Sequence, residues 1–267
     1  MSYERVDLSI SEAVAVVILD DAEALNAISI PMLGGLNAAL DAIEDPANGV
    51  RCVLLTGAGR AFSSGANLTG TDPSEVLDDE GKVDPGKPLD SAYHPVLLRL
   101  RDLRCPLLTA VNGVAAGAGM SFAMMGDIVL AARSATFLQA FRGIGLVPDC
   151  GASFLLPRTV GWGRALELSL LGQKLSAEQA LDWGLVNRVF DDDLLMAEAM
   201  KLAADLAAGP TVALGLIRKA YWKTHDNTFE DQLQLERELQ RAAGRTKDFI
   251  EGVTAFRQKR PARFLGE

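Results

Sequence analysis

Two runs of small residues are the part of this sequence whose residue types and spacing could do chemistry. Residues 62–68 read Phe-Ser-Ser-Gly-Ala-Asn-Leu and residues 112–119 read Asn-Gly-Val-Ala-Ala-Gly-Ala-Gly, and each run follows a predicted strand. Small side chains let a ligand approach the backbone and reach its N–H groups. Two N–H groups that converge from separate strand ends would form an oxyanion hole. Each run alone is also typical of an ordinary glycine-rich turn, so both interpretations stay open at this point.

Few side chains in this sequence suit nucleophilic or metal chemistry. The 267 residues include 25 Gly but only two His and three Cys. Three Cys cannot build a disulfide framework, which indicates a reducing compartment. A structural zinc site has few potential ligands here, so we expect no metal. The chemistry is therefore expected to come from carboxylates or from the backbone.

Three further motifs match known signatures only in part. Residues 57–59 read Gly-Ala-Gly after a predicted strand, but Phe62 stands where a dinucleotide-binding fingerprint needs a small residue. Ser121 resembles the nucleophile of an esterase elbow, but Ala123 replaces the final glycine and the motif falls inside a predicted helix. Cys150 has no histidine placed to activate its thiol. We expect packing roles for Ser121 and Cys150.

The charge of the chain narrows its possible partners. The 26 basic and 35 acidic residues give a formal net charge of −9, with a sequence pI near 4.9. Nucleic-acid binding needs dense Lys and Arg, so we expect no nucleic-acid partner. Residues 69–90 hold seven acids and two lysines, which favours a solvated insertion over a lid. Residues 257–263 carry four positive charges, which suit a solvated tail or a phosphate-bearing ligand.

The location is expected to be cytoplasmic. The first ten residues, MSYERVDLSI, show no cationic stretch followed by an apolar one, as a signal peptide would. Residues 105–126 carry no charge over 22 positions, a length that could span a bilayer. However, Pro106 and the glycines of this segment favour a buried strand, a turn and a buried helix. We therefore expect no membrane partner.

Strands alternate with helices in the first half of the chain, which predicts an α/β architecture with a mostly parallel sheet. The length suits one large domain, or a domain with a helical appendage. A capping box at Ser176 and Gln179 predicts a helix start. After about residue 150 the strand signal nearly vanishes. The predicted strands are 14–20, 50–56, 106–111 and 127–131, and the predicted helices are 31–43, 117–125, 162–171, 176–183, 194–208, 211–223, 229–243 and 247–257.

The segments FSSGANL, AVNGVAAGAGMSFAMMGDIVLAARSATF and GLVPDCGASFLLPR, in this order, resemble the crotonase (enoyl-CoA hydratase/isomerase) superfamily. The resemblance extends from about Val14 to Phe264 and is greatest to the ring-1,2-epoxyphenylacetyl-CoA isomerase branch. It implies a crotonase-like spiral of ββα turns (residues 1–205) followed by a C-terminal helical region (residues 206–267) used in trimer formation. It also implies an acyl-CoA thioester substrate, a homotrimer or dimer of trimers, and no cofactor, because coenzyme A is part of the substrate.

The resemblance also assigns residues to the site. The oxyanion donors would be the backbone N–H groups of Ala66 and Ala118, which agrees with the interpretation of the two runs of small residues. Asn67 replaces the common Asp after the first donor, which we interpret as a change in loop support. The residues that match positions binding the substrate or its coenzyme A part are Ala24, Leu25, Ser64, Asn67, Leu68, Phe256 and Lys259, the last two often from a neighbouring subunit.

The acids of the motifs decide the expected reaction. Hydratases of this family use two glutamates, and Ser121 and Phe141 occupy those positions here. The remaining carboxylate is Asp149, at the position where the isomerase branch places its single acid. One base suits isomerisation, because the proton taken from C2 is the proton returned at C4. We therefore expect an isomerase that uses Asp149, in partly apolar surroundings that raise its pKa.

Three alternatives to this prediction stay open. The first is a 2-enoyl-CoA hydratase that uses Asp149 and a bound water. The second is a non-catalytic acyl-CoA-binding member, since two family acids are missing. The third is that Asp149 only caps the helix that starts near Gly151.

Overall fold

Two sheets form the core of the computed structural model, which describes residues 1–68 and 76–267. The larger sheet has the strand order β1-β2-β3-β4-β6-β8-β11, antiparallel from β1 to β3 and parallel from β3 onward. The smaller sheet has the order β10-β9-β7-β5, with only β10 antiparallel. The larger sheet contains β1 Ser2–Tyr3, β2 Val6–Ser11, β3 Val14–Leu19, β4 Cys52–Gly57, β6 Leu107–Val111, β8 Ile128–Ala132 and β11 Arg188–Phe190. The smaller sheet contains β5 Ala61–Ser63, β7 Val114–Ala116, β9 Thr136–Leu138 and β10 Lys174–Ser176.

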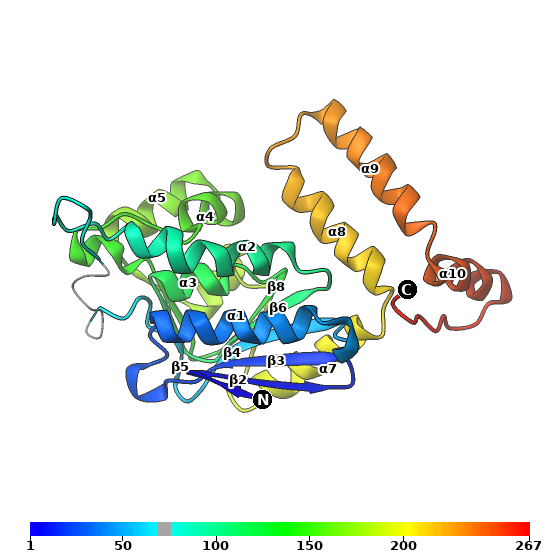
Figure 1. The fold of residues 1–267 in the computed structure, drawn as a ribbon, viewed down its shortest axis with the longest axis horizontal. Coiled ribbons are helices and arrows are strands. Elements are labelled where there is room, and N and C mark those ends of the chain that lie inside the picture. Colours follow the sequence, from blue (N-terminus) through cyan, green and yellow to red (C-terminus); the bar gives the residue numbers. More distant parts are fainter. Residues whose placement is uncertain (69–75) are drawn as a thin grey trace.

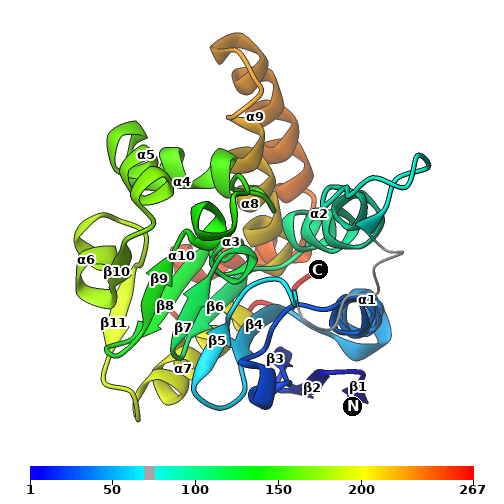
Figure 2. The same ribbon diagram turned by 90° about the vertical axis from the view of Figure 1, so that its left-hand side faces the viewer.

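The chain alternates between these sheets. β4, β6 and β8 of the larger sheet are each followed by a short strand of the smaller sheet, which faces the viewer in Figure 2, and then by a helix. This arrangement confirms the expected spiral of ββα turns. Every residue of β4 and β6 is buried, which explains their continuous apolar runs. The short strands had no signal in the sequence, because three residues are too few to show a period.

Most helices of the core lie close to the predicted ranges, but α2 was not predicted, and α4 was expected only as a helix that starts near Gly151. At α6 the capping box is confirmed: the Ser176 hydroxyl accepts from the Gln179 N–H at 3.2 Å, and the Gln179 side chain accepts from the Ser176 N–H at 3.1 Å. α1 packs against β1, β2 and β3, and α7 packs against β4, β6 and β8. These helices are α1 Ile30–Glu44, α2 His94–Asp102, α3 Ala118–Ala123, α4 Ala152–Val160, α5 Trp162–Leu171, α6 Ala177–Asp182 and α7 Leu195–Ala207.

Residues 105–126, the uncharged segment of the sequence, form β6, β7 and α3 and are almost entirely buried. This confirms the expected strand, turn and helix. Among the residues that the structure describes, no single helix is long and apolar enough to cross a membrane. Helices α7 and α8 (Thr211–Lys223) together are long and apolar enough for a membrane span by length and composition only. The two helices are bent by 104° at their junction.

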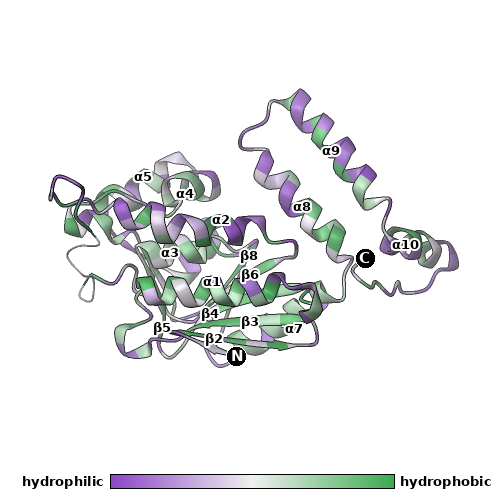
Figure 3. Ribbon diagram, viewed as in Figure 1, coloured by the Kyte–Doolittle hydropathy of each residue, from purple (hydrophilic) through white to green (hydrophobic). Residues whose placement is uncertain are grey.

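The last three helices extend away from the sheets (Figure 1). They are α8, α9 Phe229–Ala243 and α10 Lys247–Gln258, and their amphipathic composition contrasts with the apolar strands in Figure 3. No residue of α9 is buried. Arg218 joins α8 to the core: its side chain is 5% exposed and donates to the Asp127 carboxylate at 2.5 Å and to the Leu103 carbonyl at 2.5 Å. The division at residue 205 and the trimer stay expectations.

The acidic segment 69–90 lies only in part within the described residues. Residues 69–75 fall outside them, so the choice between an insertion and a lid stays open. Leu77 and Val83 form a single antiparallel bridge, and residues Leu89–Tyr93 form a π-helical turn that leads into α2. This turn is relevant to the site because it carries Tyr93.

Candidate active site

The first run of small residues begins in β5 and continues into the loop after it, which pairs with the loop before α1. The Ile28 N–H donates to the Gly65 carbonyl at 2.7 Å, and the Asn67 N–H donates to the Ile28 carbonyl at 3.0 Å. Successive peptide groups of an extended chain point to opposite sides. The N–H of Ala66 therefore points away from Ile28, and it has no acceptor among the described residues.

The second run of small residues ends in the first turn of α3. Ala118 is the first residue of α3, and an N–H at this position has no partner within its own helix. Gly117, which precedes it, has φ 50°, a left-handed conformation that glycine adopts without strain. No acceptor for the Ala118 N–H is found in the part of the chain that the structure describes.

The two runs lie against each other. A Cβ atom placed on Gly65 would lie 2.8 Å from the Ala116 carbonyl oxygen and 3.5 Å from the Ala118 nitrogen. A Cβ atom on Gly119 would lie 2.4 Å from the Ser63 carbonyl oxygen, so α3 packs directly on β5. Only glycine permits this approach. The two unpaired N–H groups thus lie on neighbouring backbone segments, the arrangement that an oxyanion hole requires.

Asp149 lies in the loop before α4. Cys150 and Gly151 both have left-handed backbones, with φ 51° and 83°, and they turn the chain into the helix. Gly151 is the N-cap residue and α4 has no side-chain cap, so the alternative of Asp149 as the capping side chain is wrong. The carboxylate oxygen Oδ1 of Asp149 is buried and has no hydrogen-bond partner among the described residues.

Burial raises the pKa of Asp149, and a hydrogen bond from the Cys150 thiol and the charge of His94 oppose that rise in part. The net shift is upward, because loss of solvation penalises the ionised carboxylate. A carboxylate with a raised pKa is a stronger base once it is ionised. This direction agrees with the expectation that partly apolar surroundings raise the pKa of Asp149.

The two positions where hydratases carry glutamate are occupied by groups that cannot act as bases. Ser121 is fully buried in α3, and its hydroxyl donates to the Asp149 carbonyl oxygen at 3.1 Å. Phe141 is buried, and its Cζ atom lies 4.0 Å from the place that a Cβ atom would take on Gly117. An aromatic ring therefore borders the two runs of small residues.

Tyr93 is a residue of this region that the sequence did not indicate. Its hydroxyl donates to the Ile28 carbonyl at 2.8 Å and is buried. Burial raises its pKa, and the nearby Cys150 and Asp149 raise it further. Tyr93 directly precedes α2, and a tyrosine beside the apolar positions of an amphipathic helix has the sequence signature of an ordinary core residue, so no local pattern could have indicated it.

The residues expected to meet coenzyme A fall into two groups. Ala24, Leu25 and Ser64 are close together: the Ser64 N–H donates to the Leu25 carbonyl at 2.9 Å, and its hydroxyl donates to the Ala24 carbonyl at 3.2 Å. Asn26, which is fully buried, fixes this loop through its side chain, with bonds of 2.8 Å to the Ala58 carbonyl and 2.7 Å to the Ala61 carbonyl. Its role as an anchor was not expected.

The other four residues expected to bind the substrate are Asn67, Leu68, Phe256 and Lys259, and they do not form one group with Ala24, Leu25 and Ser64. Asn67 donates its N–H to Ile28, as described above, and Leu68 is 64% exposed beside it. Phe256 and Lys259 lie in and just after α10, at the opposite end of the chain's long axis from β5 (Figure 1). The chain by itself does not bring these two residues to the group around Ser64. Their contact with the substrate of a neighbouring subunit stays an expectation.

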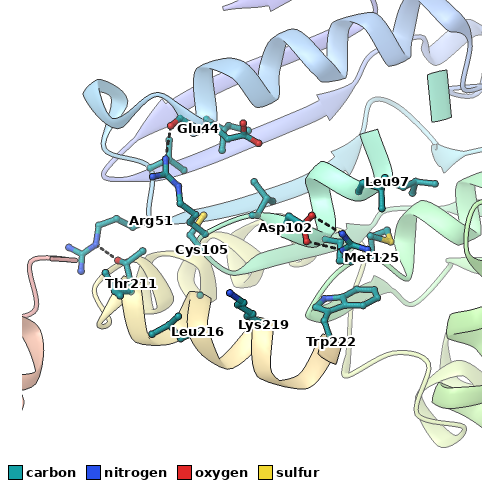
Figure 4. A pocket seen from close by; sticks show the side chains of 18 of the residues that line it. Glu44, Arg51, Leu97, Asp102, Cys105, Met125, Thr211, Leu216, Lys219 and Trp222 are labelled. Atoms are coloured by element: carbon teal, nitrogen blue, oxygen red, sulfur yellow. Dashed lines mark hydrogen bonds and ion pairs between the residues drawn. The ribbon is translucent and has the colours of Figure 1, made fainter. Parts of the chain in front are cut away.

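A cavity of about 1100 Å³ lies between α8 and the core (Figure 4). Leu97 of α2, Met125, and Leu216 and Trp222 of α8 give it apolar walls. Cys150, which directly follows Asp149, also lines it. The cavity therefore adjoins the loop of Asp149 and has room for an apolar group.

Comparisons of the sequence and of the fold with known proteins identify related acyl-CoA enzymes. The sequence profile of the family described as enoyl-CoA hydratase/isomerase matches residues 9–267. The 1,2-epoxyphenylacetyl-CoA isomerase of Escherichia coli K12 is 45% identical over 259 residues, which cover 97% of each chain. A probable enoyl-CoA hydratase of Rhodobacter capsulatus is 41% identical and covers 100% of both chains. The crystal structure of an enoyl-CoA hydratase subunit of Geobacillus kaustophilus has a TM-score of 0.89 with 33% identity, and covers 100% of both chains.

Proposed function

The chain belongs to the enoyl-CoA hydratase/isomerase family of acyl-CoA enzymes, and from this premise we propose that it is an isomerase whose single acid/base group is Asp149. Its substrates would be 3-enoyl-CoA thioesters, which become 2-enoyl-CoA, or a ring-epoxide aryl-acetyl-CoA of the kind named for its E. coli relative. The observation that carries this proposal is the buried Oδ1 atom of Asp149, which has no hydrogen-bond partner in the described part of the chain and lies next to the helix that begins at Ala118.

The proposed reaction needs one base and one oxyanion hole. The Asp149 carboxylate removes a proton from C2, and the electron pair moves onto the thioester oxygen to form a dienolate. The N–H groups of Ala66 and Ala118 donate to that oxygen. The protonated Asp149 then returns the proton to C4, and the double bond moves into conjugation with the carbonyl. The protein supplies every group of this scheme, so we propose that no cofactor or metal takes part.

The surroundings of the site favour proton transfer over addition of water. Hydration needs a second group to place and deprotonate a water molecule. Ser121 and Phe141 supply no such base, and the Phe141 ring makes the border of the hole apolar. The cavity beside Cys150 is proposed to take the far end of the acyl group.

Two other functions remain candidates. A 2-enoyl-CoA hydratase that uses Asp149 and a bound water is supported by the name of the R. capsulatus relative. A non-catalytic acyl-CoA-binding protein would explain the two missing glutamates. The buried Oδ1 atom of Asp149, and the two N–H groups that have no acceptor among the described residues, argue against it.

The choice of reaction predicts a simple activity pattern. Purified protein is expected to convert 3-hexenoyl-CoA to its conjugated 2-enoyl isomer, and to leave crotonyl-CoA largely unhydrated, because it has only one acid/base group. Absorbance of the conjugated thioester measures both reactions. Rapid hydration of crotonyl-CoA would overturn the isomerase proposal in favour of the hydratase. Binding of both thioesters without any product would favour the non-catalytic protein.

The pH dependence of the proposed reaction provides a second prediction. Asp149 must be ionised to take the C2 proton, so kcat/KM falls as the pH drops through its pKa. The Cys150 thiol lowers that pKa by hydrogen bonding, so Cys150→Ala should raise it and move the acidic limb of the kcat/KM profile to higher pH. Cys150→Ser keeps a donor and serves as the matched control, with no upward movement. An acidic limb that stays in place in Cys150→Ala would show that the thiol does not act on the base.

A further inference from the structure

We propose that Ser121 is a positioning residue for Asp149, which ties the proposed base to the helix that carries the oxyanion donor Ala118. This inference rests on the proposed function, because it assumes that Asp149 transfers the proton. It gives Ser121 a role different from that of the glutamate found at its position in hydratases, and different from the packing role expected from the sequence.

The first support is the hydrogen bonding of Ser121. Its hydroxyl lies 3.1 Å from the Asp149 carbonyl oxygen and 3.4 Å from the Gly117 carbonyl oxygen one turn earlier in its own helix. A serine in a helix usually bonds only to its own preceding turn. Here the shorter contact crosses 28 positions of the sequence to another loop. Ser121 is fully buried, so bulk water does not compete for its hydroxyl.

The second support is the backbone of the Asp149 loop. Asp149 is followed by two residues with left-handed backbones, Cys150 and Gly151, and L side chains such as that of Cys150 rarely adopt this conformation. Such a turn persists only where its surroundings hold it. The Asp149 carbonyl accepts from the Ala152 N–H at 2.9 Å on one side and from the Ser121 hydroxyl on the other. The loop is thus fixed at the residue that bears the carboxylate.

The bond between Ser121 and Asp149 fixes the distance between the proposed base, Asp149, and the proposed oxyanion hole. Ser121 is three residues after Ala118 in the same short helix, and that helix packs on β5 through Gly119. A single side chain therefore joins the rigid segment that holds the enolate oxygen to the loop that holds the base. Proton transfer depends steeply on this distance, since a misplacement of 1 Å can cost about 100-fold in rate.

The test compares removal of two buried hydroxyls that both bond to backbone carbonyls. Ser121→Ala is expected to lower kcat for 3-hexenoyl-CoA by about 10- to 100-fold, with little change in KM or in the affinity for butanoyl-CoA. Thr109→Val is the matched control, because the Thr109 hydroxyl is equally buried and donates at 2.8 Å to the Ala123 carbonyl, away from Asp149. Thr109→Val should keep kcat within about threefold of the wild-type value, although its loss of thermal stability should be similar to that of Ser121→Ala. Ser121→Cys, which keeps a weak donor, should recover part of the rate.

The outcomes separate this inference from the function on which it rests. If Asp149→Asn is inactive while Ser121→Ala keeps the wild-type kcat, the positioning role is wrong and the function stands. If Ser121→Ala and Thr109→Val lower kcat by the same factor, the role of Ser121 is only structural. If Ser121→Ala weakens butanoyl-CoA binding in proportion to the loss of rate, Ser121 supports the oxyanion hole rather than the base. If the wild-type protein shows no isomerisation, the proposed function itself fails. If Ser121→Ala does not fold, the same comparisons are made with Ser121→Cys.

Discussion

Asp149→Asn is expected to lower kcat for 3-enoyl-CoA isomerisation by at least about 1000-fold. General acid–base catalysis contributes about 10²- to 10⁴-fold, and here one group acts both as the base and as the acid. Asparagine has nearly the same shape, and it can neither take the C2 proton nor return it to C4. The substitution also removes a partly buried negative charge, so folding and thioester binding should be preserved. Steady-state kinetics and calorimetric titration with butanoyl-CoA measure the two effects separately.

Asp41→Asn is a suitable control for this variant. It makes the same chemical change at an exposed carboxylate of α1, whose side chain is 76% exposed and pairs with Arg99 at the surface. Exposed ion pairs contribute little to stability, so its kcat should match that of the wild type. If Asp149→Asn retains kcat within a few-fold of the wild type, Asp149 is not the proton-transfer group.

Ala118→Pro is expected to lower kcat by about 100- to 1000-fold, the usual effect of losing one oxyanion donor. Proline has no N–H, and its ring would occupy the place toward which the Ala118 N–H points. The first position of a helix tolerates proline, because its N–H has no partner within the helix. The fold should therefore survive while one of the two donors is lost.

Ala118→Gly is the matched control for the oxyanion hole. It also changes the side chain at this buried position but keeps the N–H. It should lose stability, by about 1 kcal/mol in helix propensity, with a much smaller change in kcat. Circular dichroism and thermal unfolding of both variants verify that each is folded. Equal kcat in Ala118→Pro and Ala118→Gly would remove this N–H from the mechanism.

Much of the fold could be predicted from the sequence because its signals are local. The buried runs at 14–20 and 50–56 coincide with β3 and β4 within two residues, since parallel strands covered on both faces must be continuously apolar. The capping box at Ser176 predicted the start of α6 because its two bonds join residues only three positions apart. The short strands of the smaller sheet were missed, because their stability comes from partners far along the chain.

The candidate site also has features that the sequence predicted and features that it could not predict. Order and spacing of motifs indicated an acyl-CoA enzyme and singled out the residues Ala66, Ala118 and Asp149. The sequence alone could not show that Gly65 and Gly119 let the two runs of small residues touch, since that approach depends on backbone atoms about 50 residues apart. Nor could it exclude Asp149 as a helix cap, because both roles place an acid just before a helix.

What the sequence determined by itself is therefore the family, the alternation of strands and helices, and the absence of a glutamate at positions 121 and 141, on which the proposal of Asp149 as the proton-transfer group rests. These depend on residue types and on neighbours close along the chain. Only the tertiary structure decided that Ser121 bonds to Asp149, that Tyr93 and Asn26 support the site, and that Phe256 and Lys259 lie away from it within one chain. Each of these is a contact between distant segments, and such contacts arise from the packing of the whole core rather than from any local pattern.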